Sequence, residues 1–182
     1  ISTGLVGSEM CIRDRATNTT ASYNTAVGNG ALTYVTTGVS NTALGYNAGG
    51  AITTGARNIA IGQGTLDNHA NGAADDNLAI GLDALGGAIN GGEKNIAIGN
   101  FVLDALTSGD DNIGIGYDAL TANTSGNYNT AVGMSALRYS TTPSSNTAIG
   151  YNAGTDITTG DENTLIGKSA GLVLTTGSDN VI

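Results

Sequence analysis

The sequence predicts an all-β protein, a parallel β-solenoid (β-roll) built from about nine coils of 17 residues. Two features of the repeat predict this fold: an asparagine that recurs about every 17 residues, and glycines at fixed distances after it. Composition is the third observation, because the 182 residues include 29 glycines but one proline, one phenylalanine and no tryptophan. So few large side chains cannot fill an ordinary layered core, so we expect the repeat itself to organise the chain.

The repeat is anchored on an asparagine, counted here as offset 0 of each unit. Seven of the nine intervals between these asparagines are 17 residues long, and the intervals from Asn58 and Asn77 are 19 and 18. Offset 3 is always aliphatic, offset 4 is always glycine, and offset 14 is glycine in eight units, with Pro143 as the departure. The repeated asparagines are Asn24, Asn41, Asn58, Asn77, Asn95, Asn112, Asn129, Asn146, Asn163 and Asn180.

Glycine at two fixed places argues against a helical repeat, because each glycine inside a helix costs about 1 kcal/mol relative to alanine. Glycine turns a corner at positive φ without steric cost, so each unit reads as short strands separated by corners. Stacked parallel strands place equal offsets about 4.8 Å apart. We therefore expect the asparagines to form a hydrogen-bonded ladder along one axis.

The chain divides into three parts. Residues 1–15 do not follow the period, residues 16–23 lead in, and residues 24–182 form the repeat domain, which we expect to be truncated because the sequence stops within a unit. Residues 1–15 lack a signal-peptide pattern and resemble translated sequencing-adapter sequence; a native capping segment is the alternative. They hold Cys11, the single cysteine, so no disulfide framework is predicted.

The strand pattern also predicts how the coil is filled. We expect offsets 3 and 8, and in some coils offset 11, to face the interior, while offset 2 points the opposite way. Small side chains behind an aliphatic stripe suit a strand covered by its own coil on one face and by a neighbouring chain on the other. This predicts a homo-oligomer, with a trimer closing the interface; a monomeric roll with a tight alanine interior is the alternative. The alanines at offset 2 are Ala26, Ala43, Ala60, Ala79, Ala97, Ala131 and Ala148.

The charge balance excludes two kinds of partner. The net charge is −9, from 15 acidic and six basic residues, whereas nucleic acids and anionic membranes require clustered lysine and arginine. No stretch approaches the roughly 18 apolar residues of a membrane span. We therefore expect no nucleic-acid partner and no membrane span in this chain.

No catalytic, cofactor-binding or metal-ligating residue is predicted. His69 is the only histidine, and a Ser-His-Asp arrangement would depend on it alone. Acidic residues precede several of the repeated asparagines, and such oxygen-rich turns suggest Ca²⁺ as an alternative. A calcium stack would require acids in nearly every turn, whereas the other corners are Val39-Ser40, Ala56-Arg57, Glu93-Lys94, Asn127-Tyr128 and Ser144-Ser145, so we interpret the acids as solvated corner charges. The acidic corners are Asp75-Asp76-Asn77, Asp110-Asp111-Asn112, Asp161-Glu162-Asn163 and Ser178-Asp179-Asn180.

Two columns of exposed side chains are candidates for interactions. Tyr46, Tyr117 and Tyr151 share offset 5 and suggest a rim that contacts protein or glycan, against plain surface tyrosines. Paired threonines at offsets 12 and 13 suggest a rival function, ice binding, although adjacent threonines leave one outward row and Ala70-Asn71 and Ile89-Asn90 interrupt it. The threonine pairs are Thr36-Thr37, Thr53-Thr54, Thr141-Thr142, Thr158-Thr159 and Thr175-Thr176.

The units starting at Asn129 (Asn-Thr-Ala-Val-Gly) and Asn146 (Asn-Thr-Ala-Ile-Gly), with the Ala-Leu and Thr-Thr-Gly segments of the repeat, resemble the repeats of phage tail-fibre-like and bacterial surface-fibre proteins. They are also similar to the head repeat of trimeric autotransporter adhesins (the YadA-like head), a left-handed trimeric β-roll that binds host surfaces. The coils here are longer than that adhesin coil. The resemblance implies an extracellular fibre module, on a virion tail or a bacterial surface, that displays a surface for host attachment to a protein or glycan.

Overall fold

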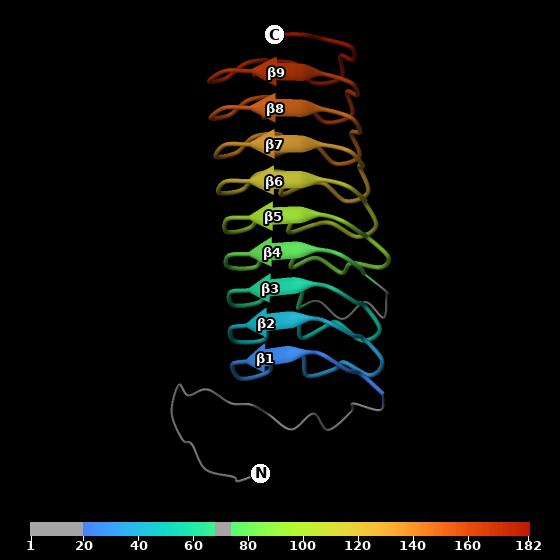
Figure 1. Cartoon of the computed structure of the whole chain (residues 1–182). Helices are drawn as coiled ribbons and strands as arrows, with labels where there is room; N and C mark the ends of the chain where they lie inside the picture. The colour runs from blue at the N-terminus through green and yellow to red at the C-terminus, as the bar shows by residue number, and fades with distance from the viewer. Residues whose placement is uncertain (1–19, 68–73) are drawn as a thin grey trace.

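A computed structural model describes residues 20–67 and 74–182 and shows nine parallel strands in one sheet, ordered β1 to β9 along a single stack (Figure 1). Each strand pairs with the next at equal offsets, as Ile96 of β5 does with Ile113 of β6. The predicted fold class is therefore confirmed. The strands are β1 (Thr25–Val27), β2 (Thr42–Leu44), β3 (Ile59–Ile61), β4 (Leu78–Ile80), β5 (Ile96–Ile98), β6 (Ile113–Ile115), β7 (Thr130–Val132), β8 (Thr147–Ile149) and β9 (Thr164–Ile166).

The glycine at offset 4 turns the chain directly after each strand. These glycines have φ between 129° and 143°, a region that side chains rarely adopt. From Gly28 to Gly150, an added Cβ would lie 2.2–2.6 Å from the carbonyl oxygen of the glycine one coil further on. Both the backbone angle and the close approach of the stacked corners thus require glycine. None of the described residues forms a helix that is long and apolar enough to cross a membrane.

The interior of each coil differs from the prediction in which face of the strand is internal. Offsets 8 and 11 face inward as expected, and Leu32, Leu103, Val35 and Leu106 are fully buried. Offset 3, predicted to be internal, points outward instead, and Ile166 there is 61% exposed. Offset 2, predicted to face a neighbouring chain, is instead the one inward position of the three-residue strand, as in the alternative of a roll with an alanine interior. In most coils the larger side chains from offsets 8 and 11 leave room there for alanine alone. The alanines with no exposed surface at offset 2 are Ala43, Ala60, Ala79, Ala97, Ala131 and Ala148.

Offset 8 is always leucine or glycine, and its backbone is left-handed. Leu32 and Leu137 have φ of 50° and 49°, uncommon for a bulky residue, and burial of the side chain holds them there. Where glycine stands at offset 8, a side chain from another position fills the space that leucine would occupy. A Cβ on Gly154 would meet the Leu165 side chain at 2.8 Å and the Ile157 side chain at 3.2 Å. Leu165, the one leucine at offset 2, is therefore explained by Gly154 in the preceding coil and Gly171 in its own coil, where an added Cβ would meet it at 2.8 and 2.9 Å.

In the two longer coils the extra residues come before the residue whose carbonyl accepts from the repeated asparagine. In the 17-residue coils the side-chain amide of the repeated Asn donates to the residue at offset 14, as Asn95 does to the Gly109 carbonyl at 2.8 Å. In the coils starting at Asn58 and Asn77 the acceptors are Ala74 and Gly92. In the sequence, offset 14 of these two units is Gly72 and Gly91. Gly92 rather than Gly91 is the acceptor in the second unit, and Gly72 lies outside the described residues. The shift places Ile89 in the core, 6% exposed.

A matched pair of core residues tests this packing. Gly114 replaces the usual alanine at offset 2, and a Cβ there would lie 2.4 Å from Cγ1 of Val102, which replaces the usual alanine at offset 7. We expect Gly114→Ala to destabilise the chain by about 1–3 kcal/mol through overpacking. Val102→Ala alone leaves a cavity and costs about 2 kcal/mol.

The double variant recreates the alanine pair that Ala119 and Ala131 form one coil later, so its loss should be at least about 1 kcal/mol smaller than the sum of the single losses. Thermal unfolding followed by circular dichroism measures all three variants. If the stability loss of the double variant equalled the sum of the single losses, the side chains at positions 102 and 114 would not compete for the same space.

Candidate functional site

The asparagine ladder is the most highly connected polar feature of the structure. The backbone N–H and Nδ2 of Asn112 donate to Oδ1 of Asn95 at 3.0 and 3.1 Å, and Nδ2 also donates to the Gly126 carbonyl at 2.8 Å. Oδ1 of Asn112 in turn accepts from the backbone N–H and Nδ2 of Asn129, both at 3.0 Å. Asn95, Asn112 and Asn129 have no exposed surface. Each amide therefore joins three coils, and the predicted ladder is confirmed.

A second ladder, which the sequence analysis missed, runs along the residues two places before six of the repeated asparagines. The backbone N–H of Ala56 donates to Oδ1 of Asp75 at 2.7 Å, and that of Ser144 donates to Oδ1 of Asp161 at 2.6 Å. The side-chain oxygen of one coil thus receives the N–H of the coil before it. The signal was present as a column of short oxygen-bearing side chains. The acceptors are Asp75, Asp110, Asn127, Ser144, Asp161 and Ser178.

The acidic corners therefore serve the backbone, and the calcium alternative gains no support. Across residues 20–67 and 74–182, no three His, Cys, Asp or Glu side chains come together in a way that could hold a metal ion. The carboxylates of Asp75, Asp110 and Asp161 already accept backbone hydrogen bonds. His69 and Cys11 lie outside the described residues.

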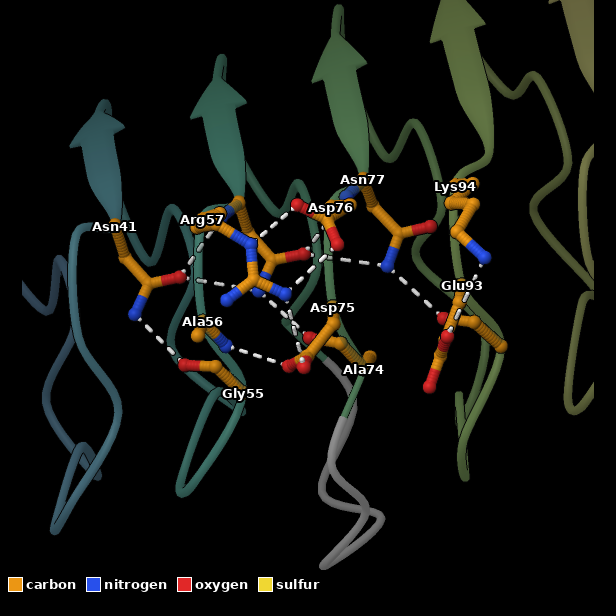
Figure 2. A network of polar contacts seen from close by, with 12 residues as sticks. Asn41, Gly55, Ala56, Arg57, Ala74, Asp75, Asp76, Asn77, Glu93 and Lys94 are labelled. Carbon is orange, nitrogen blue, oxygen red and sulfur yellow. Dashed lines mark hydrogen bonds and ion pairs between the residues drawn. The ribbon is translucent and has the colours of Figure 1, made fainter.

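Arg57 joins two coils at the corner where the longest unit ends (Figure 2). Its Nη2 lies 2.8 Å from Oδ2 of Asp76 and 3.3 Å from Oδ2 of Asp75. Hydrogen bonding to Arg57 holds the pKa of Asp76 below its ordinary value. These groups are exposed to solvent, so water and salt screen the attraction and its contribution to stability is small. The arginine orients the corner more than it stabilises the fold.

Acidic side chains also meet at the turns after β4 to β6. Burial, and then the negative charges of Asp83 and Asp118, raise the pKa of the Asp104 carboxyl above its ordinary value. Asp118 is itself paired with Nη2 of Arg138 at 3.0 Å. Ionised Asp104 is therefore held in a less favourable setting than water provides.

The outward surface of the sheet carries no charge. We call the side chains at offsets 1 and 3 of β1 to β9 the sheet face; all of them are Thr, Ile, Leu or Val. Leu44, Ile59 and Ile149 are 48%, 40% and 40% exposed. A continuous strip of uncharged and largely aliphatic side chains thus runs the length of a chain whose net charge is −9.

The threonine pairs divide their roles between the two positions. At offset 12 the hydroxyl is used inside the stack, as Oγ1 of Thr107 donates to the Thr124 carbonyl at 2.8 Å. Offset 13 forms the single outward row that the sequence predicts. In the coil starting at Asn77 the two places are held by Asn90 and Gly91 rather than by Ile89 and Asn90. The exposed hydroxyls of this row belong to Thr37, Thr54, Ser108, Ser125, Thr142, Thr159 and Thr176.

The tyrosines at offset 5 lie on the surface, as predicted. Tyr46, Tyr117 and Tyr151 are 56%, 50% and 44% exposed. The Tyr117 ring meets Phe101 edge-on at 5.8 Å between ring centroids, and Nζ of Lys168 lies 6.0 Å from the Tyr151 ring. Aromatic side chains thus line part of one edge of the stack, directly after the glycine corners.

No family model, no curated protein and no solved structure matches this chain.

The asparagine ladder predicts that removing one side-chain amide strongly lowers the stability of the fold. In Asn112→Ala the backbone N–H and Nδ2 of the buried Asn129 lose the acceptor Oδ1, and the Gly126 carbonyl keeps only the longer bond, 3.3 Å, from Nδ2 of Asn123. We expect a loss of about 3–5 kcal/mol, because each unsatisfied buried group costs about 1–3 kcal/mol. The matched control is Asn127→Ala, which removes the single acceptor of the Asp110 N–H and should cost about 1 kcal/mol. Equal losses in denaturant unfolding would contradict a special role for the ladder.

Asp104 predicts a pH dependence of stability. Because its pKa is raised in the folded chain, ionisation costs more in the folded than in the unfolded state. Below the unfolded pKa of about 3.9 both states are protonated and there is no cost. The cost grows as the pH rises through the raised folded pKa and persists above it.

Asp104→Asn should therefore melt at a higher temperature than the wild type at neutral pH and at the same temperature near pH 3. Asp156→Asn, two coils beyond Asp118, makes the same change of charge away from the cluster and is the control. A neutral-pH melting temperature of Asp104→Asn at or below the wild-type value would refute this account.

Proposed function

We propose that this chain is a structural and adhesive fibre module, the shaft or head of a phage tail fibre or of a bacterial surface adhesin. It forms a homotrimer and acts by display, holding a binding surface away from the particle or cell. The observation that carries the proposal is the sheet face, which is uncharged over all nine strands of a chain with a net charge of −9. The resemblance of the repeat to those of fibre proteins points the same way.

The sheet face supports self-association in particular. Two acidic chains repel one another over most of their surface, so an uncharged strip is where identical copies approach at least electrostatic cost. The side chains of the sheet face recur at the coil spacing, about 4.8 Å, and a second copy presents side chains with the same spacing. Contacts around a three-fold axis close the assembly and let each chain meet two neighbours.

Stiffness and exposure support the display role. Successive coils are joined by backbone pairing, by the asparagine ladder and by the second ladder, so the stack behaves as one extended body. The tyrosines at offset 5 remain exposed and provide amphipathic anchors for a host protein or glycan. The site of action is extracellular, at a virion tail or a bacterial surface.

Ice binding is the second candidate, and the exposed row at offset 13 favours it. Within the described coils this is one row, and the hydroxyls beside it at offset 12 are committed to the next coil, as in Thr158 to Thr175 at 3.1 Å. A thermal-hysteresis assay separates the two functions.

The oligomeric state tests the fibre proposal. We expect native mass spectrometry of the chain to give a trimer, and Ile149→Glu to dissociate it, because this change places a charge in the contact without altering the interior. Thr159→Glu adds the same charge to the exposed row of the same coil and should leave the trimer intact. A monomeric wild-type chain, or a trimer that Ile149→Glu leaves unchanged, would contradict the proposed interface.

A further inference from the structure

The dipeptide Asn-Gly occurs twice in the described part of the chain, as Asn29-Gly30 and Asn90-Gly91. In this dipeptide the backbone nitrogen of glycine can attack the side-chain amide carbon of asparagine, because glycine has no side chain that obstructs the approach. The five-membered ring that forms requires both residues to leave their initial conformation. Whether the reaction occurs in the folded chain therefore depends on how firmly the surroundings hold the two residues.

The surroundings hold Asn90 and Gly91 loosely. Both residues are exposed, and an added Cβ on Gly91 would meet no atom within 4 Å. The Gly91 N–H and the Asn90 side-chain amide make no hydrogen bond to another residue of the described part. In the next coil the equivalent N–H, that of Ser108, donates to the Thr124 carbonyl at 3.2 Å. The attacking nitrogen is thus free in the coil that starts at Asn77.

The same dipeptide is held firmly at Asn29 and Gly30. The Asn29 carbonyl accepts the backbone N–H of Asn47 at 2.8 Å, and the Gly30 carbonyl accepts the hydroxyl of Thr33 at 2.8 Å. Gly30 is buried, and a Cβ on it would clash with Oδ1 of Asn47. Ring closure here has to break contacts between the first and second coils.

We propose that Asn90 is a site of spontaneous deamidation, with water as the co-reactant, and that Asn29 is protected by the fold. The Gly91 nitrogen loses its proton to a base in solution and bonds to Cγ of Asn90. The bond from Cγ to Nδ2 breaks, and that nitrogen leaves as ammonia. Water then opens the cyclic imide at either of its two carbonyl carbons, which gives aspartate or isoaspartate at position 90.

The product adds one negative charge to a row that otherwise has none. Asn90 takes the place of offset 12 in its coil, and the other described residues at this offset are threonines. The Asn90 N–H donates to the Thr107 carbonyl at 2.6 Å. This bond lies before the point at which isoaspartate adds a carbon to the main chain. We therefore expect the modified coil to stay attached to the next one.

The wild-type chain tests this inference because it contains its own control. It is incubated in mildly alkaline buffer, folded or unfolded in urea, and peptide mapping follows the mass increase at each asparagine. Cleavage before Asp75 and Asp83 separates Asn90 from Asn71, which lies outside the described residues. In urea Asn29 and Asn90 should react at similar rates, since they share the dipeptide. In the folded chain Asn90 should react at least about tenfold faster, because hydrogen bonds must open before Asn29 can react.

Asn90→Gln is the matched variant. It keeps an uncharged amide but requires a larger ring, so the mass increase at position 90 should disappear. A smaller ratio of the two rates in the folded chain overturns the inference, as does a folded-state rate at Asn90 more than about tenfold below its rate in urea. The trimer measured by native mass spectrometry depends on the sheet face, so neither result bears on the fibre proposal.

Discussion

The buried amide of the repeated asparagine is the interaction on which the stack depends. Its Oδ1 accepts the backbone N–H of the next asparagine, and its Nδ2 donates both to the previous amide and to a carbonyl across its own coil. The same group therefore ties neighbouring coils together and closes each coil on itself. An aspartate would lack the donor and an aliphatic residue would lack both functions. The coil-to-coil register, including the strand pairing, follows from this one column of side chains.

A narrow coil explains the composition. Because the interior admits one strand residue, alanine occupies offset 2, and leucine or glycine occupies offset 8 according to what the neighbours provide. Gly114 with Val102 shows that volume is exchanged between adjacent coils, and Leu165 with Gly154 and Gly171 shows exchange both between coils and within one. The aliphatic residues at offset 3 are consequently turned outward. The same narrowness that limits the core thus produces the sheet face.

The sequence period was enough to predict the strands, the glycine corners and the asparagine ladder, since each is a column of one residue type. It could not predict which strand face is internal, because Ala43 and Leu44 alternate on a strand of three residues and either order satisfies the alternation. It also missed the second ladder, because Asp75, Asn127 and Ser144 differ in kind and share only an oxygen at the same reach.

The two longer coils have a consequence for how such a chain changes over time. Their extra residues enter before Ala74 and Gly92, and β3, β4 and β5 still pair at equal offsets. The added residues leave the pairing of the flanking strands undisturbed. A fibre of this design separates its scaffold from its variable segments. Loops of new length and chemistry can be accepted one coil at a time, without changing how the other coils pair.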